Sequence, residues 1–127
     1  MNKAYTPKSQ LPQMVAFRAL GRLKQGEKNK SEMAYEDQVL KPAMTAGEIL
    51  WYAFEPWKVR IGANCFYTPD YAVLRRGGQL ECHEVKGFWT DDARVKIKAA
   101  AATMPFQFIA ITRASKAKGG GWIEERF

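Results

Sequence analysis

Two runs of β-branched and aromatic residues flank a glycine-containing turn near the middle of the chain. They span residues 66–75 and 79–87, on either side of Arg76-Gly77-Gly78. Residues of these types favour a pleated, half-buried surface, and the glycines supply a turn, so the pattern predicts two antiparallel strands. Because side chains alternate along a strand, Glu84 and Lys86 share one face while Val85 points to the other.

Whether Asp70 joins Glu84 depends on the number of residues in the turn. Directly facing residues on neighbouring strands keep their Cβ atoms within about 4.5–5.5 Å. A loop with an odd number of residues, such as Arg76-Gly77-Gly78, sets Asp70 opposite Glu84. A two-residue Gly77-Gly78 turn would set Asp70 against Val85, on the wrong face, and a bulge near Pro69 would restore the pairing.

Helical patterns precede and follow this hairpin. Apolar residues recur at helical spacing over residues 13–24. Ser31 is predicted to cap a helix over residues 32–46 that Pro42 kinks or divides. The clearest helix is predicted over residues 93–104, capped by the cluster Thr90-Asp91-Asp92.

Further strands are expected on both sides of the central hairpin. Residues 49–54 and 58–61 precede it and form a meander with it, residues 106–112 form a buried strand, and residues 122–127 form an edge strand. The order α-β-β-β-α-β predicts an α/β fold in which flanking helices cover a mixed central sheet.

The paired carboxylates carry the first chemical implication. If Asp70 and Glu84 face each other, their charges repel unless a cation neutralises them, and all-oxygen ligation with room for water suits Mg²⁺ or Mn²⁺. Structural alternatives exist, since Asp70 after Pro69 is a common turn residue and Glu84 can pair with Lys86 at the surface. A buried carboxylate is expensive unless it is paired or binds metal, and this favours the metal site.

The same residues carry a resemblance to a known family. Pro69-Asp70, followed after thirteen residues by Glu84-Val85-Lys86, resembles the signature of the PD-(D/E)XK nuclease superfamily. Segments at 29–32, 46–52, 66–70, 83–89 and 92–96 are similar to a small phage and prophage nuclease-like family, itself distantly similar to junction-resolving phage endonucleases. The resemblance covers roughly residues 20–127. It implies a restriction-endonuclease-like core and metal-dependent hydrolysis of phosphodiester bonds in DNA.

The resemblance also implies roles for individual residues. Asp70, Glu84, the Val85 carbonyl and Glu32 would hold the metal. Lys86 would orient or deprotonate the attacking water, or counter phosphate charge.

The third carboxylate has competing candidates. Glu32, Glu36 and Glu48 all precede the hairpin, and the segment Asn29-Lys30-Ser31-Glu32 favours Glu32 by resemblance. Its structural alternative is ordinary placement in a first helical turn. His83 points away from the Glu84 face by alternation, so a structural histidine is expected rather than a ligand.

Charge is concentrated at the amino terminus. The formal net charge is +7, and residues 1–30 hold seven basic residues against one acid, which leaves 13 basic and 12 acidic residues for the rest. We therefore divide the chain into a basic arm, residues 1–30, and a nuclease-like domain, residues 31–127. A basic arm suits a polyanionic partner such as DNA, although a solubilising tail is the alternative.

Basic residues at two places are candidate phosphate contacts. The candidates are Arg18, Arg22, Lys24, Lys28 and Lys30 in the arm and Arg94, Lys96 and Lys98 on the helix after the hairpin. Trp89 is the one aromatic residue singled out for base stacking, because it follows the end of the hairpin.

Composition bounds location and assembly. Cys65 and Cys82 are too few for a disulfide framework and are expected to be buried reduced thiols. No signal peptide or membrane span is evident, so we expect a cytoplasmic protein, in the host cytoplasm if phage-encoded. Two coordinated cuts require two sites, which favours a homodimer with residues 14–23 as its interface. The rival functions are a non-catalytic nucleic-acid-binding phage accessory protein that retains the fold, and a structural phage component.

Overall fold

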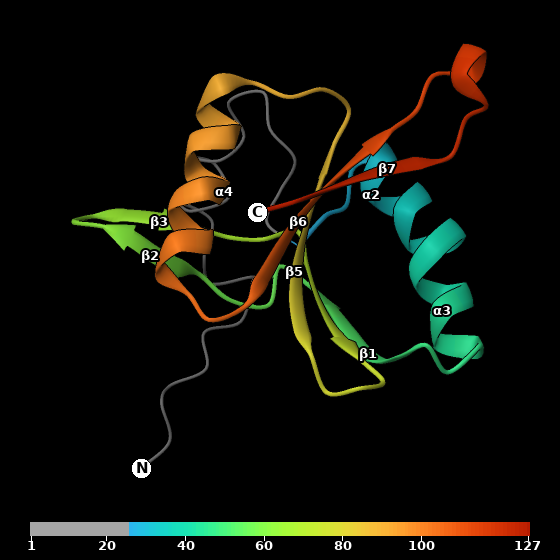
Figure 1. Ribbon diagram of the computed structural model, residues 1–127, viewed down its shortest axis with the longest axis horizontal. Helices are drawn as coiled ribbons and strands as arrows, with labels where there is room; N and C mark the ends of the chain where they lie inside the picture. Colours follow the sequence, from blue (N-terminus) through green and yellow to red (C-terminus); the bar gives the residue numbers. More distant parts are fainter. Residues whose placement is uncertain (1–25) are drawn as a thin grey trace, which may run out of the picture.

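A five-stranded mixed sheet separates two helical layers in the computed structural model, which describes residues 26–127 (Figure 1). The strand order is β1-β4-β5-β6-β7. Neighbouring strands are antiparallel except for the parallel pair β5–β6. The bounds are Ile49–Phe54 for β1, Tyr71–Arg75 for β4, Leu80–Lys86 for β5, Gln107–Arg113 for β6 and Trp122–Arg126 for β7. The mixed α/β class predicted from the sequence is confirmed.

One face of the sheet is covered by a helical segment in three parts. These are α2, Lys30–Tyr35, the π-helical turn η2, Glu36–Leu40, and α3, Lys41–Thr45. The cap of this segment is Asn29, whose Oδ1 accepts from the Glu32 N–H while Glu32 Oε1 accepts from the Asn29 N–H, both at 2.8 Å. The prediction that Ser31 caps the helix was wrong, because the reciprocal pair satisfies two helix-end donors at once.

Pro42 changes the winding of this helix rather than ending it. In the π-helical turn the Lys41 N–H bonds the carbonyl of Glu36, five residues back. Leu40 and Lys41 keep helical dihedral angles, and α3 continues with Pro42 in its first turn. A proline in a helix removes one donor, and the wider turn just before it accommodates that loss.

The other face carries α4, Asp91–Thr103. Thr90 caps it by accepting the Ala93 N–H at 3.2 Å, as the sequence predicted, and the helix ends just before Met104 and Pro105. Parallel strands need a crossover connection, and α4 supplies it between β5 and β6. Ile97 and Ala100 are buried against the sheet.

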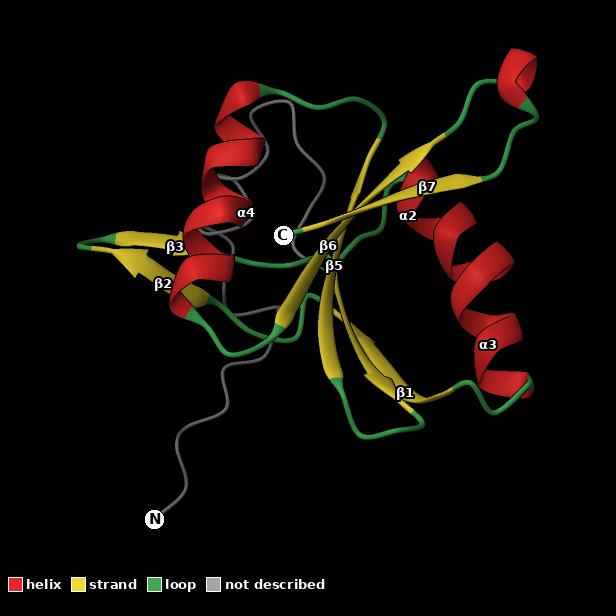
Figure 2. Ribbon diagram, in the orientation of Figure 1, coloured by secondary structure: helices red, strands yellow, loops and turns green. Residues whose placement is uncertain are grey.

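A separate hairpin leaves the main sheet beside α4. Within residues 26–127, strands β2, Val59–Gly62, and β3, Cys65–Tyr67, pair only with each other (Figure 2). The prediction of one strand over residues 66–75 was therefore wrong, because Pro69 cannot donate to a ladder and Thr68-Pro69-Asp70 breaks the run. The predicted meander was also wrong: β1 pairs directly with β4, and the β2–β3 hairpin between them in sequence is not part of the main sheet. Cys65 is exposed on this hairpin, contrary to expectation, whereas Cys82 is buried.

The β4–β5 pairing answers the question of register. Tyr71 lies opposite His83 and Val73 opposite Glu81. The Arg75 N–H donates to the Gln79 carbonyl at 2.8 Å, so the loop has three residues, with Gly78 at φ +94°. The odd-numbered loop is the correct alternative. One step beyond Tyr71 and His83, this register sets Asp70 against Glu84.

Two apolar clusters lie on opposite faces of the sheet. The cluster beneath α2, η2 and α3 consists of Tyr35, Leu40, Ile49, Tyr71, Val73, Val85, Ile109 and Ile111. The cluster beneath α4 consists of Val59, Tyr67, Cys82, Ile97, Ala100, Phe108 and Ala110. Strand β5 therefore sends Val85 into the first cluster and Cys82 into the second. By alternation Glu84 lies on the α4 face with Cys82.

The predicted arm is described only from residue 26 onward. The Gly26 N–H donates to Glu55 Oε1 at 3.2 Å, and Lys28 Nζ lies 2.6 Å from Glu36 Oε1. The helix predicted over residues 13–24, with Arg18, Arg22 and Lys24, lies outside the described residues, as does the predicted dimer interface. Within residues 26–127 no helix has the length and apolar character needed to cross a membrane.

The turn that sets the register can be tested through Gly78. Gly78→Ala should lower the free energy of unfolding by about 1 kcal/mol, because alanine is strained at φ +94°. Gly62→Ala is the matched control, since φ is ordinary there and its Cβ would meet only Cys65 Cβ at 3.7 Å. We expect the control to stay within about 0.5 kcal/mol. Urea unfolding measures both, and equal losses would contradict the assignment of strain to Gly78.

Candidate active site

Three residues singled out by the sequence meet where β4 begins and β5 ends. Asp70 Oδ2 accepts the Val85 N–H at 2.8 Å, which ties the start of β4 to β5. Lys86 Nζ lies 3.1 Å from Glu84 Oε2, and Glu84 is only 6% exposed. Two carboxyl groups and one ammonium group therefore share a small, largely buried space on the α4 face of the sheet.

Burial and mutual repulsion dominate the electrostatics of the two carboxyl groups. Burial, the charge of Glu84 and the charge of Glu32 raise the pKa of Asp70 to about 9, against the opposing hydrogen bond from Val85. Burial also raises the pKa of Glu84, although Lys86 and Tyr67 both favour its ionised form. With both carboxyl groups ionised, the site would carry more negative charge than Lys86 alone neutralises, so Asp70 keeps its proton at neutral pH.

Lys86 is held in its charged form. Burial alone would lower the pKa of Lys86, but the charge and hydrogen bond of Glu84, with further contributions from Asp70 and Glu32, raise it above its ordinary value. A protonated ammonium group donates hydrogen bonds and accepts none. In this site Lys86 can therefore orient a water molecule or a phosphate oxygen more readily than it can accept a proton.

Glu32 occupies two roles at once. It is 7% exposed, and its Oε1 accepts the Asn29 N–H in the capping box. Its charge also contributes to the raised pKa of Asp70, so the two carboxyl groups are neighbours. The first-turn placement weighed in the sequence is thus observed together with proximity to the site.

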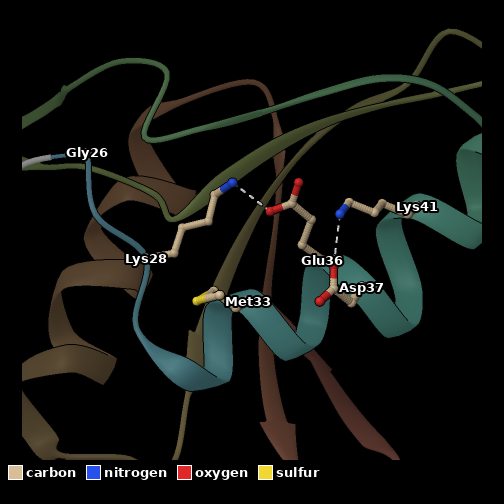
Figure 3. Close-up of a pocket in the computed structure, with 6 residues that line it drawn as sticks. All are labelled: Gly26, Lys28, Met33, Glu36, Asp37 and Lys41. Carbon is tan, nitrogen blue, oxygen red and sulfur yellow. Dashed lines mark hydrogen bonds and ion pairs between the residues drawn. The ribbon is translucent and has the colours of Figure 1, made fainter.

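The competing carboxylates are held elsewhere. Glu36 accepts from Lys28 at 2.6 Å and from the Tyr52 hydroxyl at 2.5 Å, beside an open pocket of about 410 Å³ (Figure 3). Burial would raise the pKa of Glu36, but Lys28 and Tyr52 lower it below its usual value. Glu48 is exposed just before β1. Of the three, Glu32 is the one whose charge is among the main causes of the raised pKa of Asp70.

Tyr67 is a site residue that sequence reasoning missed. Its buried hydroxyl donates to Glu84 Oε1 at 2.6 Å, from β3 in the separate hairpin. The strand is interrupted at Pro69, and this turns β3 out of the sheet and brings Tyr67 over Glu84. Alternation along a single strand gives no signal of this contact, because the two residues belong to different sheets.

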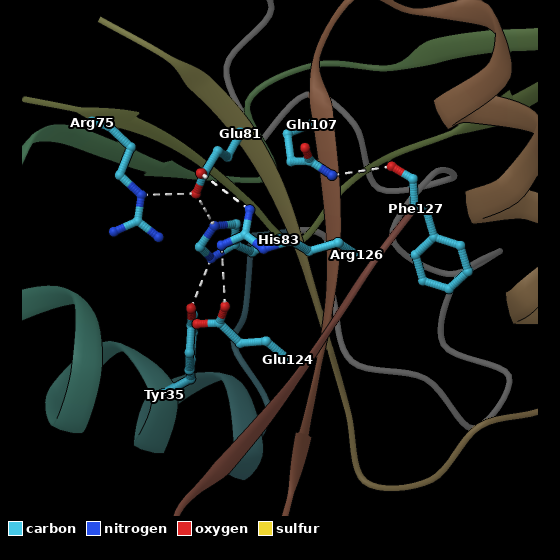
Figure 4. Close-up of polar contacts among 8 residues, drawn as sticks. All are labelled: Tyr35, Arg75, Glu81, His83, Gln107, Glu124, Arg126 and Phe127. Carbon is cyan, nitrogen blue, oxygen red and sulfur yellow. Dashed lines mark hydrogen bonds and ion pairs between the residues drawn. The ribbon is translucent and has the colours of Figure 1, made fainter. Parts of the chain in front are cut away.

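A hydrogen-bonded chain lies behind the site, on the opposite face of β5 (Figure 4). The Tyr35 hydroxyl lies 2.7 Å from His83 Nδ1, and His83 Nε2 lies 2.9 Å from Glu81 Oε1. Arg75 Nε also donates to Glu81 Oε1 at 2.9 Å.

The ionised state of Glu81 fixes the direction of the hydrogen bonds that it receives. Burial would raise the pKa of Glu81, but His83 and Arg75 lower it, so the carboxylate only accepts. His83 therefore donates from Nε2 to Glu81. His83 faces away from Glu84, as alternation predicted, and both of its ring nitrogens are paired within the structure.

The candidate phosphate contacts fall into two groups. Arg94 is engaged within the fold, with NH1 and NH2 2.9 and 2.7 Å from the two Glu125 oxygens and its guanidinium over Trp89. Lys28 is paired with Glu36, and Trp89 packs against Phe127 rather than standing free. The exposed candidates among the described residues are Lys30, Lys96 and Lys98.

The donor set suits a hard divalent cation anchored by few protein ligands. Buried carboxylates with raised pKa values are groups that a bound cation would stabilise in their ionised form. Within residues 26–127, however, no group of three His, Cys, Asp or Glu side chains lies in metal-holding geometry. The residues present fit an ion held by Asp70 and Glu84 together with backbone oxygen and water.

Comparison with protein families, with curated proteins and with solved structures gave no match to this chain.

The pKa of Asp70 predicts how stability depends on pH without metal. Between about pH 4 and pH 9 the folded chain keeps the Asp70 proton that the unfolded chain loses, so stability falls as pH rises through this range. Asp70→Asn should therefore raise the free energy of unfolding at neutral pH by at least about 1 kcal/mol and flatten this dependence.

Urea unfolding in EDTA across this pH range measures the effect. Asp37→Asn is the control, because Asp37 is exposed and pairs only with Lys41 on the helix surface. A loss of stability in Asp70→Asn at neutral pH would contradict the repulsion described above.

The Tyr67 hydrogen bond can be separated from general packing. Tyr67→Phe should raise the pKa of Glu84 further, because the bond favours the carboxylate, and should cost about 1–3 kcal/mol of stability. Tyr71→Phe is the control, since the buried Tyr71 hydroxyl donates to the backbone carbonyl of Glu32, which carries no charge. NMR titration of the Glu84 side chain should show a shift in the first variant only. An unchanged Glu84 titration in Tyr67→Phe would reduce Tyr67 to a packing role.

Proposed function

We propose that the chain is a metal-dependent endonuclease of the PD-(D/E)XK type that hydrolyses phosphodiester bonds in DNA. The observation that carries this proposal is the β4–β5 register, which brings Asp70 and Glu84 together with Lys86 on one buried face. The strand order and the crossover helix α4 support a restriction-endonuclease-like core. The resemblance of the segments around these residues to the phage nuclease-like family points the same way.

Each residue of the site has a role in this proposal. Asp70, Glu84 and the Val85 carbonyl would hold Mg²⁺ or Mn²⁺, with Glu32 as a further ligand. When bound, such an ion lowers the pKa of a coordinated water and stabilises the charge that develops on the phosphate.

The surrounding groups keep these residues in place. The Val85 N–H fixes Asp70, and the Tyr67 hydroxyl fixes one oxygen of Glu84. Lys86, held protonated beside Glu84, donates to the attacking water or to a phosphate oxygen. Trp122 packs edge-on against Tyr35, with 5.3 Å between the ring centroids, and this contact supports the opposite face of β5.

DNA is the proposed substrate because charge and site agree. The acidic site supplies chemistry rather than affinity for a polyanion, so affinity must come from basic residues elsewhere. Residues 1–30 hold most of the excess positive charge, and Lys30, Lys96 and Lys98 are exposed on the domain. The sequence favours a phage-related protein that acts in the host cytoplasm. In this form of the proposal it is a homodimer that makes two coordinated cuts.

The alternative is a nucleic-acid-binding accessory protein that keeps this fold without turnover. Two observations favour it: Glu32 is already used in a capping box, and no three-ligand group occurs within residues 26–127. Metal-dependent nicking of plasmid DNA separates the two functions.

Cleavage should depend on Glu84 but not on the nearby Glu36. Glu84→Gln should reduce Mg²⁺-dependent nicking by at least about 10²-fold while DNA binding remains, because Glu84 would hold metal rather than phosphate. Glu36→Gln is the matched control, as a partly buried carboxylate on the helical segment that is already paired with Lys28 and Tyr52. Plasmid nicking and fluorescence anisotropy measure the two properties.

Glu32→Gln distinguishes the two arrangements of the metal site. A loss of nicking comparable to Glu84→Gln makes Glu32 a ligand, and retention of most activity leaves it as a capping residue. Full activity in Glu84→Gln, with folding unchanged, would exclude this site as the catalytic centre.

A further inference from the structure

The β2–β3 hairpin presents an aromatic and a basic side chain side by side. Phe66 is 51% exposed although it is a large apolar residue. Arg60 is its direct partner across the hairpin and is also exposed. The Arg60 Nε donates to the Gly62 carbonyl at 3.3 Å, which anchors the side chain at the turn. A cross-strand pair of this kind forms a small surface with one flat apolar group and one cation.

The hairpin is uniformly basic. Residues 56–69 contain Lys58 and Arg60 and no acidic residue, and both side chains are exposed. At the far edge of the main sheet, β7 carries Glu124 and Glu125 beside Arg126, and the loop before it carries Lys116 and Lys118. The hairpin therefore complements a polyanion through two cations that have no acidic neighbour within residues 56–69.

The root of the hairpin contacts the proposed catalytic carboxylate. Tyr67, the residue after Phe66, points inward to Glu84, while Phe66 points outward. The α-carbons of the consecutive residues Phe66 and Tyr67 are about 3.8 Å apart, and one DNA strand advances about 3.4 Å per nucleotide. A strand with a phosphate at Glu84 therefore reaches Phe66 and Arg60 within a few nucleotides.

The hairpin is also held firmly enough to position a ligand. Trp57 and Ile61 pack against the cluster beneath α4, and Val59 is buried within it. The outer face of the hairpin remains exposed, as does its tip from Gly62 to Phe66.

We propose that the outer face of the β2–β3 hairpin binds unpaired nucleotides next to the cleaved bond, with Phe66 stacking on a base and Arg60 contacting a phosphate. The inference rests on the proposed function and narrows its substrate class to DNA with an unpaired strand, such as a fork or a flap. Bases within a duplex already stack on each other, whereas unpaired bases stack readily on aromatic side chains.

The test compares forked DNA with duplex DNA of equal length, by fluorescence anisotropy in EDTA so that metal-dependent cleavage does not occur. Phe66→Ala should weaken binding to the fork by roughly 5- to 150-fold and leave duplex binding unchanged. Phe66→Trp should restore fork binding. Arg60→Ala should reduce the log–log salt slope on the fork by about 0.7.

Matched controls come from the other end of the molecule. Ile123→Ala removes an apolar side chain that is 49% exposed on β7, and Lys118→Ala removes an exposed cation from the loop before it. Neither should change fork binding, and thermal melting should show all variants folded. Light scattering reports whether Phe66 instead lies between two copies of the chain.

The outcomes separate this inference from the proposed function. Equal loss on fork and duplex, no loss in Phe66→Ala, or conversion of a dimer to a monomer by that variant overturns the hairpin assignment, even if the chain cleaves DNA. A wild-type chain that binds forks through Phe66 but never cleaves them sustains the hairpin assignment and removes the nuclease. A wild-type chain that binds neither forked nor duplex DNA overturns both the hairpin assignment and the proposed function.

Discussion

The repulsion between two buried carboxyl groups is the constraint on which the rest of the structure depends. Asp70 and Glu84 are adjacent only because the β4–β5 loop has three residues, and every surrounding contact reduces the cost of holding them there. A backbone N–H serves Asp70, a phenol and an ammonium serve Glu84, and both pKa values still lie above their ordinary range. A folded chain that keeps such an arrangement sacrifices stability that an apolar pair would provide.

Two sheets and one helix contribute to this one place. Glu32 comes from α2, Tyr67 from the separate hairpin, and Glu84 from the centre of the main sheet. On the reverse face, the chain from Tyr35 through His83 to Glu81 fixes the side chains of β5 that do not face the site. Strand β5 is therefore braced from both faces, which limits the movement available to Glu84.

Sequence alone predicted the parts of this arrangement that follow from local chemistry. The Thr90 cap, the strand β6 and the direction of His83 away from the Glu84 face all follow from nearest neighbours and alternation. The turn length was left open, because Gly77-Gly78 satisfies two- and three-residue loops equally well and only the packed sheet selects between them.

What could not be predicted depends on contacts between distant segments. Tyr67 reaches Glu84 because the chain leaves the sheet at Pro69, and no period in the sequence encodes that departure. The choice of Asn29 over Ser31 as the cap is local by contrast: a cap at Asn29 places Glu32 at the third helical position, where it completes a capping box, whereas a cap at Ser31 would place Ala34 there. The pairing of Arg94 with Glu125 joins α4 to a strand that comes near it only in the folded chain.

The π-helical turn before Pro42 determines which side chains of the first helix reach the sheet. Tyr35 and Leu40 are both 1% exposed, yet they are five residues apart, and an α-helix would rotate the second away from the first by about 140°. The wider winding over Glu36–Leu40 returns Leu40 to the side of Tyr35. In evolutionary terms this segment behaves as a helix with one inserted residue: losing that residue would leave Leu40 four positions after Tyr35 in an ordinary α-helix, about 40° away, so everything from Leu40 to Thr45 would keep its inner and outer sides.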